Sequence, residues 1–246
     1  MQSTPVHTSV SMQQEYGERN KQWLLWEPAT ASDWHDSVVS TCIQDGADVN
    51  ATLLDGCSPL FHAVQMCNVK SVDVLLKAGA DPHATDVFGN TLCHTAVVCQ
   101  ATEGLRLLID AGMNVDVRNE HGCSSLHYTV PDAILGASTD ADCADIVKIL
   151  VAAGADVDSA DMRGHTPVWR SVAARCPVVT KTLIEAGASV SQRLVELSRA
   201  AAATATPGSP TYVVAAMVTA AAAWPTSARC IWITSCVQGG GDSLFS

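Results

Sequence analysis

The chain has 246 residues, 48% of them hydrophobic, which is enough apolar material for one sizeable core or one elongated array of smaller units. It carries 25 acidic and 14 basic residues, and the resulting net charge of −11 argues against general binding to nucleic-acid phosphates. The ten cysteines are scattered and form no Cys-x-x-Cys pair, which argues against a disulfide framework.

The first two predicted segments are a flexible stretch over residues 1–17 and a tryptophan-rich stretch over residues 18–50. The former has no apolar core of the kind found in secretory signals. Together with the scattered cysteines, this predicts reduced thiols and a location in the cytoplasm or nucleus. The latter holds Trp23, Trp26 and Trp34 before a segment with helical periodicity.

Two series of glycines then recur in phase along the chain. The first series is Gly46, Gly79, Gly112, Gly154 and Gly187, with steps of 33, 33, 42 and 33 residues. The second series is Gly56, Gly89, Gly122 and Gly164, with steps of 33, 33 and 42 residues. A fixed period of this length is typical of stacked repeats, and one copy has nine extra residues, which fall within residues 131–145.

A tetrad follows each glycine of the second series. The four tetrads are Ser58-Pro59-Leu60-Phe61, Thr91-Leu92-Cys93-His94, Ser124-Ser125-Leu126-His127 and Thr166-Pro167-Val168-Trp169. The arrangement resembles the ankyrin repeat, whose pattern joins Asp-x-x-Gly-x-Thr-Pro-Leu-His, two antiparallel helices and a Leu-Leu-x-x-Gly-Ala-Asp close. The resemblance covers about residues 18–203 and implies an all-α solenoid of helix-turn-helix units with hairpin loops and divergent caps.

Mapped onto the chain, the resemblance predicts a cap, four repeats, a closing helix and a tail. These are the cap at 18–50, repeats at about 51–83, 84–116, 117–158 and 159–191, a closing helix at 192–203, and an Ala-rich, poorly ordered tail at 204–246. An apolar run over residues 211–224 stops at Pro225, short of the roughly 20 residues that a membrane-spanning helix needs. A membrane-tethered protein is therefore an alternative but not the expectation.

Helical periodicity supports the same units without the family name. Val72 and Leu75 lie on one helical face in the first copy, as do Leu105 and Leu108 in the second. One helix pair buries too little surface to be stable alone, so the units must stack. Serine or threonine before each first helix can cap that helix, and the first-series glycines suit a left-handed turn after each second helix.

The histidines at first resemble a metal or catalytic site, because His83 and His94 lie near Cys93, Asp81 and Asp86. The family resemblance instead implies that the tetrad histidines His94 and His127 are structural, with the imidazole bonded to neighbouring backbone. We therefore expect no catalytic residue, no cofactor and no metal site, with a cysteine nucleophile as the alternative.

Partner recognition in the ankyrin family uses the concave face, which consists of hairpin tips and exposed positions of the first helices. By phase, the candidate partner-binding residues are Leu54, Asp55, Cys57, Gln65, Met66, Val87, Phe88, Asn90, Glu120, His121, Cys123, Met162, Arg163 and His165. The apolar tips of the first two copies predict a binding patch. The alternative is that these tips pack against the N-terminal segment.

The sequence thus predicts a non-catalytic protein–protein interaction module, a scaffold or adaptor that binds one partner protein on its concave face as a monomer. It does not predict nucleic-acid or membrane binding. A substrate-recognition subunit of a ubiquitin ligase complex is the alternative function, because residues 194–202 are faintly similar to the opening of a ligase-recruiting box.

Overall fold

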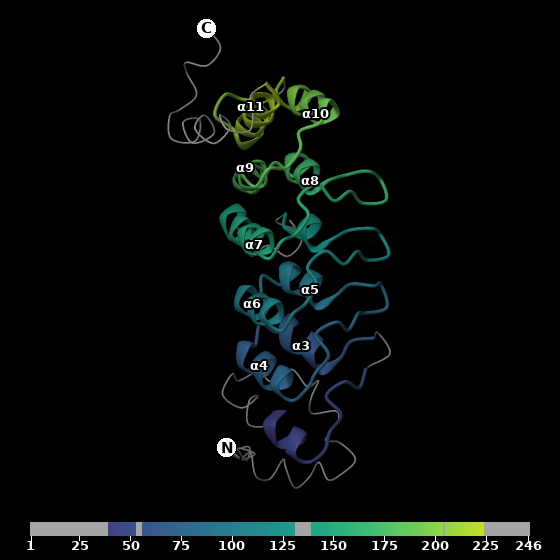
Figure 1. Ribbon diagram of the computed structural model, residues 1–246. Coiled ribbons are helices and arrows are strands. Elements are labelled where there is room, and N and C mark those ends of the chain that lie inside the picture. The colour runs from purple at the N-terminus through teal and green to yellow at the C-terminus, as the bar shows by residue number, and fades with distance from the viewer. Residues whose placement is uncertain (1–38, 53–55, 131–138, 204, 224–246) are drawn as a thin grey trace, which may run out of the picture.

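The helices lie in two columns in the structure, a computed structural model that describes residues 39–52, 56–130, 139–203 and 205–223. One column holds the first helix of each pair: α3 (Pro59–Gln65), α5 (Leu92–Val98), the 3-10 helix η2 (Ser125–Tyr128), α8 (Pro167–Ala173) and α10 (Gln192–Ala202). The other holds α4 (Val69–Lys77), α6 (Thr102–Asp110), α7 (Asp140–Ala152), α9 (Pro177–Glu185) and α11 (Pro210–Ala223). Hairpins project from the first column (Figure 1), so the predicted all-α ankyrin solenoid is confirmed.

One continuous hydrophobic core runs between the two columns from Val39 to Ala221. The predicted helical stripes contribute to it, since Leu75, Leu105 and Leu108 are at most 1% exposed. Full burial of one such side chain stabilises the fold by about 1.5–3 kcal/mol. Because each core side chain lies between successive pairs, the units depend on one another for stability.

The third repeat differs from its neighbours on both sides of the predicted insertion. Its first helix, η2, has only four residues. In the repeat phase Pro131 corresponds to Val98, the last residue of α5. A proline disfavours helical backbone in the residue before it. Its second helix, α7, has 13 residues, whereas α6 has nine. The inserted sequence therefore adds a helical turn at the start of α7; residues 131–138 lie outside the described part.

The extra turn of α7 caps the second helix of the next repeat. The side chain of Asp140 accepts hydrogen bonds from the backbone N–H of Val178 at 2.7 Å and of Val179 at 3.0 Å. The residue preceding α9, Cys176, supplies no side-chain cap. Because Pro177 has no N–H, Asp140 thus satisfies the first two N–H groups of α9, and it does so from a neighbouring repeat.

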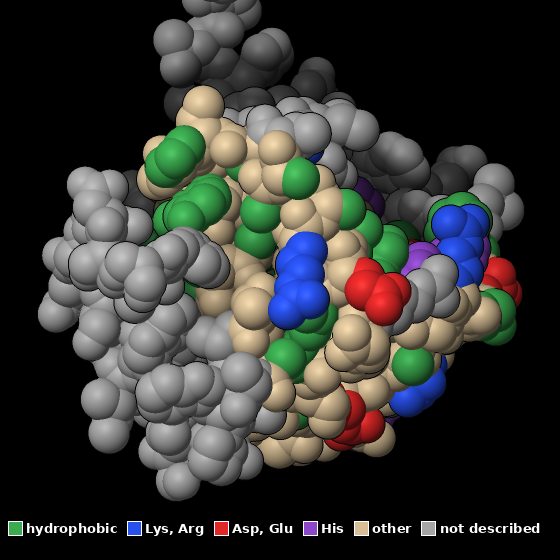
Figure 2. Space-filling view, turned by 90° about the horizontal axis from the view of Figure 1, so that it is seen from above, with side chains coloured by type: hydrophobic (Ala, Val, Ile, Leu, Met, Phe, Trp, Pro, Cys, Tyr) green, Lys and Arg blue, Asp and Glu red, His purple; other side chains and the backbone are tan. Residues whose placement is uncertain are grey.

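The expectation of a poorly ordered tail is wrong for residues 210–223, which form α11. Val214, Met217 and Val218 are buried, and α11 packs on α9 and α10, so the helix at 192–202 does not close the array. Alanines on the other faces of α11 reduce the contrast between its buried and exposed sides. None of the helices within the described ranges has the length and hydropathy needed to cross a bilayer. Figure 2 shows hydrophobic side chains at this end of the stack.

The two tetrad histidines link the second repeat to the third and the third repeat to the fourth. The Nδ1 atom of His94 accepts from the backbone N–H of Thr91 at 3.1 Å, and Nε2 lies 2.9 Å from the carbonyl of Cys123 in the next hairpin. His127 repeats this geometry, with 3.1 Å to the N–H of Ser124 and 3.0 Å to the carbonyl of His165. Since a carbonyl can only accept, Nε2 carries the proton in both rings. The predicted structural role of these histidines is confirmed.

The first repeat lacks this tie because Phe61 occupies the histidine position. The buried hydroxyl of Ser58, whose counterparts Thr91 and Ser124 meet an imidazole, has no hydrogen-bond partner among the described residues. Phe61 is itself only 1% exposed, so apolar packing replaces the polar tie at this end of the array.

Replacing Asp140 should weaken the junction between the third and fourth repeats. We expect Asp140→Ala to lower the free energy of unfolding by about 1–2 kcal/mol, because two N–H groups of α9 lose their acceptor. Asp145→Ala on the same helix is the matched control: its carboxylate forms an exposed pair with Lys148 at 2.7 Å, and its loss should cost under about 0.5 kcal/mol. Equal urea midpoints for the two variants would contradict this capping role.

Acid should destabilise the fold through the tetrad histidines. Burial lowers the pKa of His94 and of His127 below the ordinary 6.5, so the unfolded chain binds protons that the folded chain does not. This contribution to stability is complete above pH 6.5 and is lost as the pH falls toward the folded pKa values. Urea midpoints measured from about pH 8 to about pH 5 should therefore fall, and less steeply for His94→Gln. An unchanged slope in His94→Gln, or a slope equally reduced by exposed His83→Gln, would refute the assignment.

Candidate functional site

The second, third and fourth hairpins are each braced by one side chain at their base. The Oδ1 atom of Asp161 accepts hydrogen bonds from the backbone N–H groups two and four residues later, those of Arg163 and His165, at 2.8 and 2.9 Å. Asp86 and Asn119 accept from the corresponding N–H groups of their own hairpins at 2.8 and 3.0 Å. The tip residues between these bonds are thus held in a fixed outward direction.

The hairpin tips also stack on one another. The backbone N–H of Glu120 donates to the carbonyl of Phe88 at 3.1 Å, and that of Met162 to the carbonyl of His121 at 3.2 Å. Gly122 has φ of +70°, and a Cβ built on it would lie 3.0 Å from the backbone nitrogen of Met162. This close approach needs a glycine, so neighbouring hairpins form a continuous edge with little freedom to separate.

Exposed apolar side chains occur at these tips. Val87 is 51% exposed, Phe88 58% and Met162 75%, whereas a solvated hairpin gains nothing from such residues. Leu54 and Asp55, the predicted tip of the first repeat, lie outside the described residues. Exposed apolar side chains therefore occur on the second and fourth hairpins, with polar Glu120 and His121 on the third hairpin between them.

The other predicted tip residues, Glu120, His121 and Arg163, are also exposed, as are Gln65 and Met66 at the end of α3. All five are accessible to a partner. The structure brings Glu120, His121 and Arg163 onto one edge through the stacked hairpins.

Two of the four residues after the second-series glycines turn inward. Cys57 is 8% exposed and Cys123 is 1% exposed, so their expected exposure is wrong. At this point the backbone enters the first helix and faces the preceding repeat, as the bond from His94 to the carbonyl of Cys123 shows. Asn90 and His165 are half-buried.

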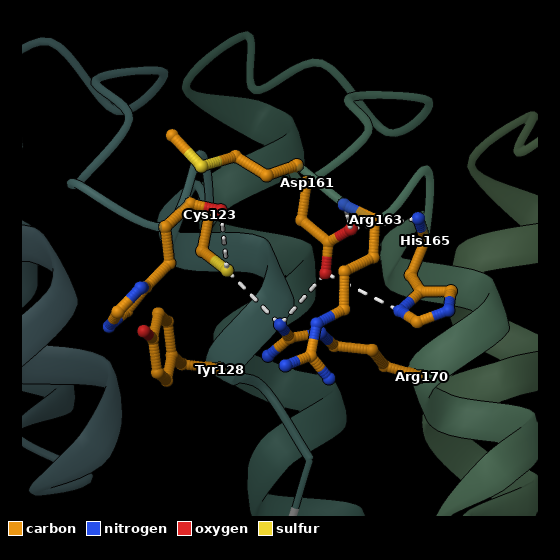
Figure 3. Close-up of a pocket in the computed structure, with 8 residues that line it drawn as sticks. Cys123, Tyr128, Asp161, Arg163, His165 and Arg170 are labelled. Carbon is orange, nitrogen blue, oxygen red and sulfur yellow. Dashed lines mark hydrogen bonds and ion pairs between the residues drawn. The ribbon is translucent and has the colours of Figure 1, made fainter.

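A pocket of about 490 Å³ opens where the third and fourth hairpins meet η2 and α8 (Figure 3). Its lining consists of His121, Cys123, Tyr128, Asp161, Met162, Arg163, His165 and Arg170. We call it the Arg163–Arg170 pocket. Five of these eight residues are predicted partner-binding residues, and the structure brings them together.

Arg170 is fixed at the floor of this pocket. One terminal nitrogen of its guanidinium lies 3.0 Å from Oδ2 of Asp161 and 3.1 Å from the sulfur of Cys123, and the other lies 3.4 Å from the carbonyl of His127. The guanidinium carbon lies 5.8 Å from the centre of the Tyr128 ring. A charged group with this many contacts is preorganised rather than mobile.

Asp161 is ionised in this setting. Its burial by itself would raise the pKa of the carboxyl, but the N–H groups of His165 and Arg163 and the guanidinium of Arg170 outweigh burial and hold the pKa at about 2. His165 adds its Nδ1 atom at 3.5 Å and stacks on Trp169 with ring centres 3.6 Å apart. Both carboxylate oxygens are therefore engaged by the protein itself.

The sequence analysis missed Tyr128 and Arg170. Both directly follow a tetrad, at the position where the first helix turns toward the hairpins. The repeat phase alone could have identified this position, because it recurs at the same distance from every second-series glycine. What the phase could not give is that Tyr128 and Arg170 would line one pocket with Asp161 and the hairpin residues.

Two of the buried thiols, Cys93 and Cys176, are poorly suited to act as nucleophiles. Burial, with a smaller contribution from Asp116, raises the pKa of the Cys93 thiol to about 11, and burial with nearby Asp140 and Cys143 raises that of Cys176 to about 12. Such thiols stay protonated at neutral pH and are poor nucleophiles. Within the described ranges, no three His, Cys, Asp or Glu side chains are placed to hold a metal ion together.

Comparison with known proteins gives the same repeat. The family model described as "Ankyrin repeat" matches residues 55–87. The mouse B-cell lymphoma 3 protein homolog is 29% identical over 148 residues, which is 58% of this chain and 31% of that protein. Human B-cell lymphoma 3 protein is 31% identical over 120 residues, 47% of this chain and 24% of that protein.

The Arabidopsis thaliana E3 ubiquitin-protein ligase KEG is 36% identical over 94 residues, 38% of this chain and 5% of that protein. The chain thus spans less than a third of each of these three relatives. The phased glycines, the tetrad hydrogen bonds, the stacked helix pairs and the family match agree. The chain is an ankyrin repeat protein, and its repeats are a protein–protein interaction module.

Proposed function

We propose that this protein is a non-catalytic scaffold or adaptor that binds a partner protein along its hairpin tips and the adjoining groove. The observation that carries the proposal is the exposure of Val87, Phe88 and Met162 on a rigid edge. Apolar side chains that are exposed and already ordered lose little conformational entropy on binding, so they are suited to anchoring a partner.

Charge and composition support the remaining parts of the proposal. The net charge of −11 disfavours nucleic acid as the partner. No disulfide joins any of the described cysteines, in keeping with a reducing compartment, the cytoplasm or the nucleus. We propose that the protein acts as a monomer, since the exposed large apolar residues are spread over the hairpin tips and several helices and form no broad apolar face.

The alternative role, a ubiquitin ligase subunit, is not favoured by the surroundings of residues 194–202. Leu194 is 1% exposed and Val195 is 4% exposed, and both belong to the core of the array. Side chains that stabilise a repeat in this way are not available to recruit a ligase without opening α10.

Two substitutions at the second hairpin should abolish partner capture. We expect full-length Val87→Asp/Phe88→Asp to recover about tenfold less of the proteins that co-purify with the wild-type chain, because two apolar anchors become charged. The thermal midpoint should change little, since both side chains are exposed. Quantitative mass spectrometry of the captured proteins and a thermal melt of each variant are the measurements.

Val69→Asp is the matched control, because Val69 is also exposed, at 39%, but lies at the start of α4 in the other helix column. Its capture should equal that of the wild type. Equal losses in both variants, or full capture by the double variant, would refute the binding edge. A collapsed melt would show instead that Val87 and Phe88 pack against another part of the chain.

A further inference from the structure

The Arg163–Arg170 pocket has a surplus of positive charge in a strongly acidic protein. Two guanidinium groups and one carboxylate line it, whereas the whole chain has a net charge of −11. A positively charged pocket on an otherwise acidic protein attracts an anionic group to that pocket. In Figure 2 the hairpin side, on the right, shows Lys or Arg and His side chains beside hydrophobic and acidic ones.

The single carboxylate in the pocket cannot neutralise both arginines. Oδ1 of Asp161 accepts two backbone N–H groups, and Oδ2 is bonded to Arg170 and lies near Nδ1 of His165. Arg163 is exposed, and its guanidinium forms no ion pair with any residue in the described ranges. Its charge is therefore available to a ligand.

Arg170 also retains donors. A guanidinium has five N–H groups, and the contacts to Asp161, Cys123 and His127 use three of them. Figure 3 shows the side chains of Arg163 and Arg170 both extending into the space between Tyr128 and His165. The fork of Arg163 matches the planar, bidentate geometry of a carboxylate, and Arg170 adds two single N–H donors, on Nε and Nη1.

The rim of the pocket is apolar on one side. Met162 is 75% exposed, and its side chain is unbranched and polarisable, so it adapts to differently shaped apolar groups. The ring of Tyr128 lines the same pocket. A ligand that presents a carboxylate to the arginines can thus place an adjacent apolar side chain against Met162.

We propose that the Arg163–Arg170 pocket binds a carboxylate side chain of an acidic partner segment, with a neighbouring apolar residue of that segment against Met162. The inference rests on the proposed function, because it names the chemistry of the partner at one part of the binding edge. Val87 and Phe88 then provide an apolar contact two hairpins away, and the two contacts together set the direction of the bound segment.

Selection of peptides tests this proposal without a known partner. The probe is a phage-displayed library of random dodecapeptides, selected on the full-length wild-type chain. The selected peptides are then synthesised, and their dissociation constants are measured by fluorescence anisotropy. We expect the selected peptides to be enriched in Asp and Glu. Arg163→Glu should weaken their binding by about tenfold or more, since it replaces an attractive charge with a repulsive one, and Arg163→Lys by less, since it keeps the charge but loses the fork.

Arg106→Glu is the matched control, because Arg106 is exposed on α6 and the substitution changes the net charge by the same amount. Its peptide affinity should stay near that of the wild type. The proposal would be overturned if no peptides were selected or if the selected peptides were not enriched in acidic residues. Equal losses of peptide affinity in Arg163→Glu and Arg106→Glu would also overturn it. Displacement of the peptide by inorganic phosphate at matched ionic strength would assign the pocket to phosphate and overturn it as well.

The experiments distinguish failure of the proposed function from failure of the acidic-segment proposal. Partner capture that depends on Val87 and Phe88 but is unaffected by Arg163→Glu would leave the binding edge in place and remove the acidic-segment proposal. Conversely, acidic peptides could require Arg163 while partner capture is insensitive to Val87→Asp/Phe88→Asp. That result would support the acidic-segment proposal and refute the binding edge.

Discussion

A hydrogen bond from one repeat to the backbone of the following hairpin sets the geometry of this array. The imidazole of His94 spans from the N-terminus of its own helix to the carbonyl of Cys123, and His127 spans to the carbonyl of His165. Each bond links a helix to a hairpin 29 or 38 residues further along. Apolar packing in the core does not orient the hairpin tips, so these histidine hydrogen bonds determine where the tips lie relative to the helices.

The same constraint creates the candidate binding surface. Asp161 braces its hairpin and at the same time anchors Arg170 from α8, so one buried carboxylate serves both the fold and the pocket. Replacing it would leave the half-buried guanidinium of Arg170 with fewer partners as well as a loosened hairpin. Function and stability are therefore coupled at this residue, whereas Arg163 and Phe88 project from the edge and can vary without cost to the core.

Much of the fold could be predicted from the sequence, because the repeat encodes the same local geometry several times. The glycines after second helices adopt left-handed backbone, and Gly46, Gly79 and Gly112 all have φ between +86° and +88°. The structural role of His94 and His127 was also predictable from the tetrad. The order of residues 210–223 was not, since a helix rich in alanine shows little contrast between faces and becomes stable only on packing against α9 and α10.

The sequence by itself determined the repeat unit, its phase, the helices, and the residues available at each hairpin tip, because these follow from local backbone preferences and from apolar periodicity. Only the tertiary structure decided that Cys57 and Cys123 face inward, that Asp140 caps a helix in the next repeat, and that Arg163 and Arg170 share one pocket. Those facts depend on how neighbouring units stack, and stacking places together side chains from different repeats whose separation in sequence carries no signal of contact.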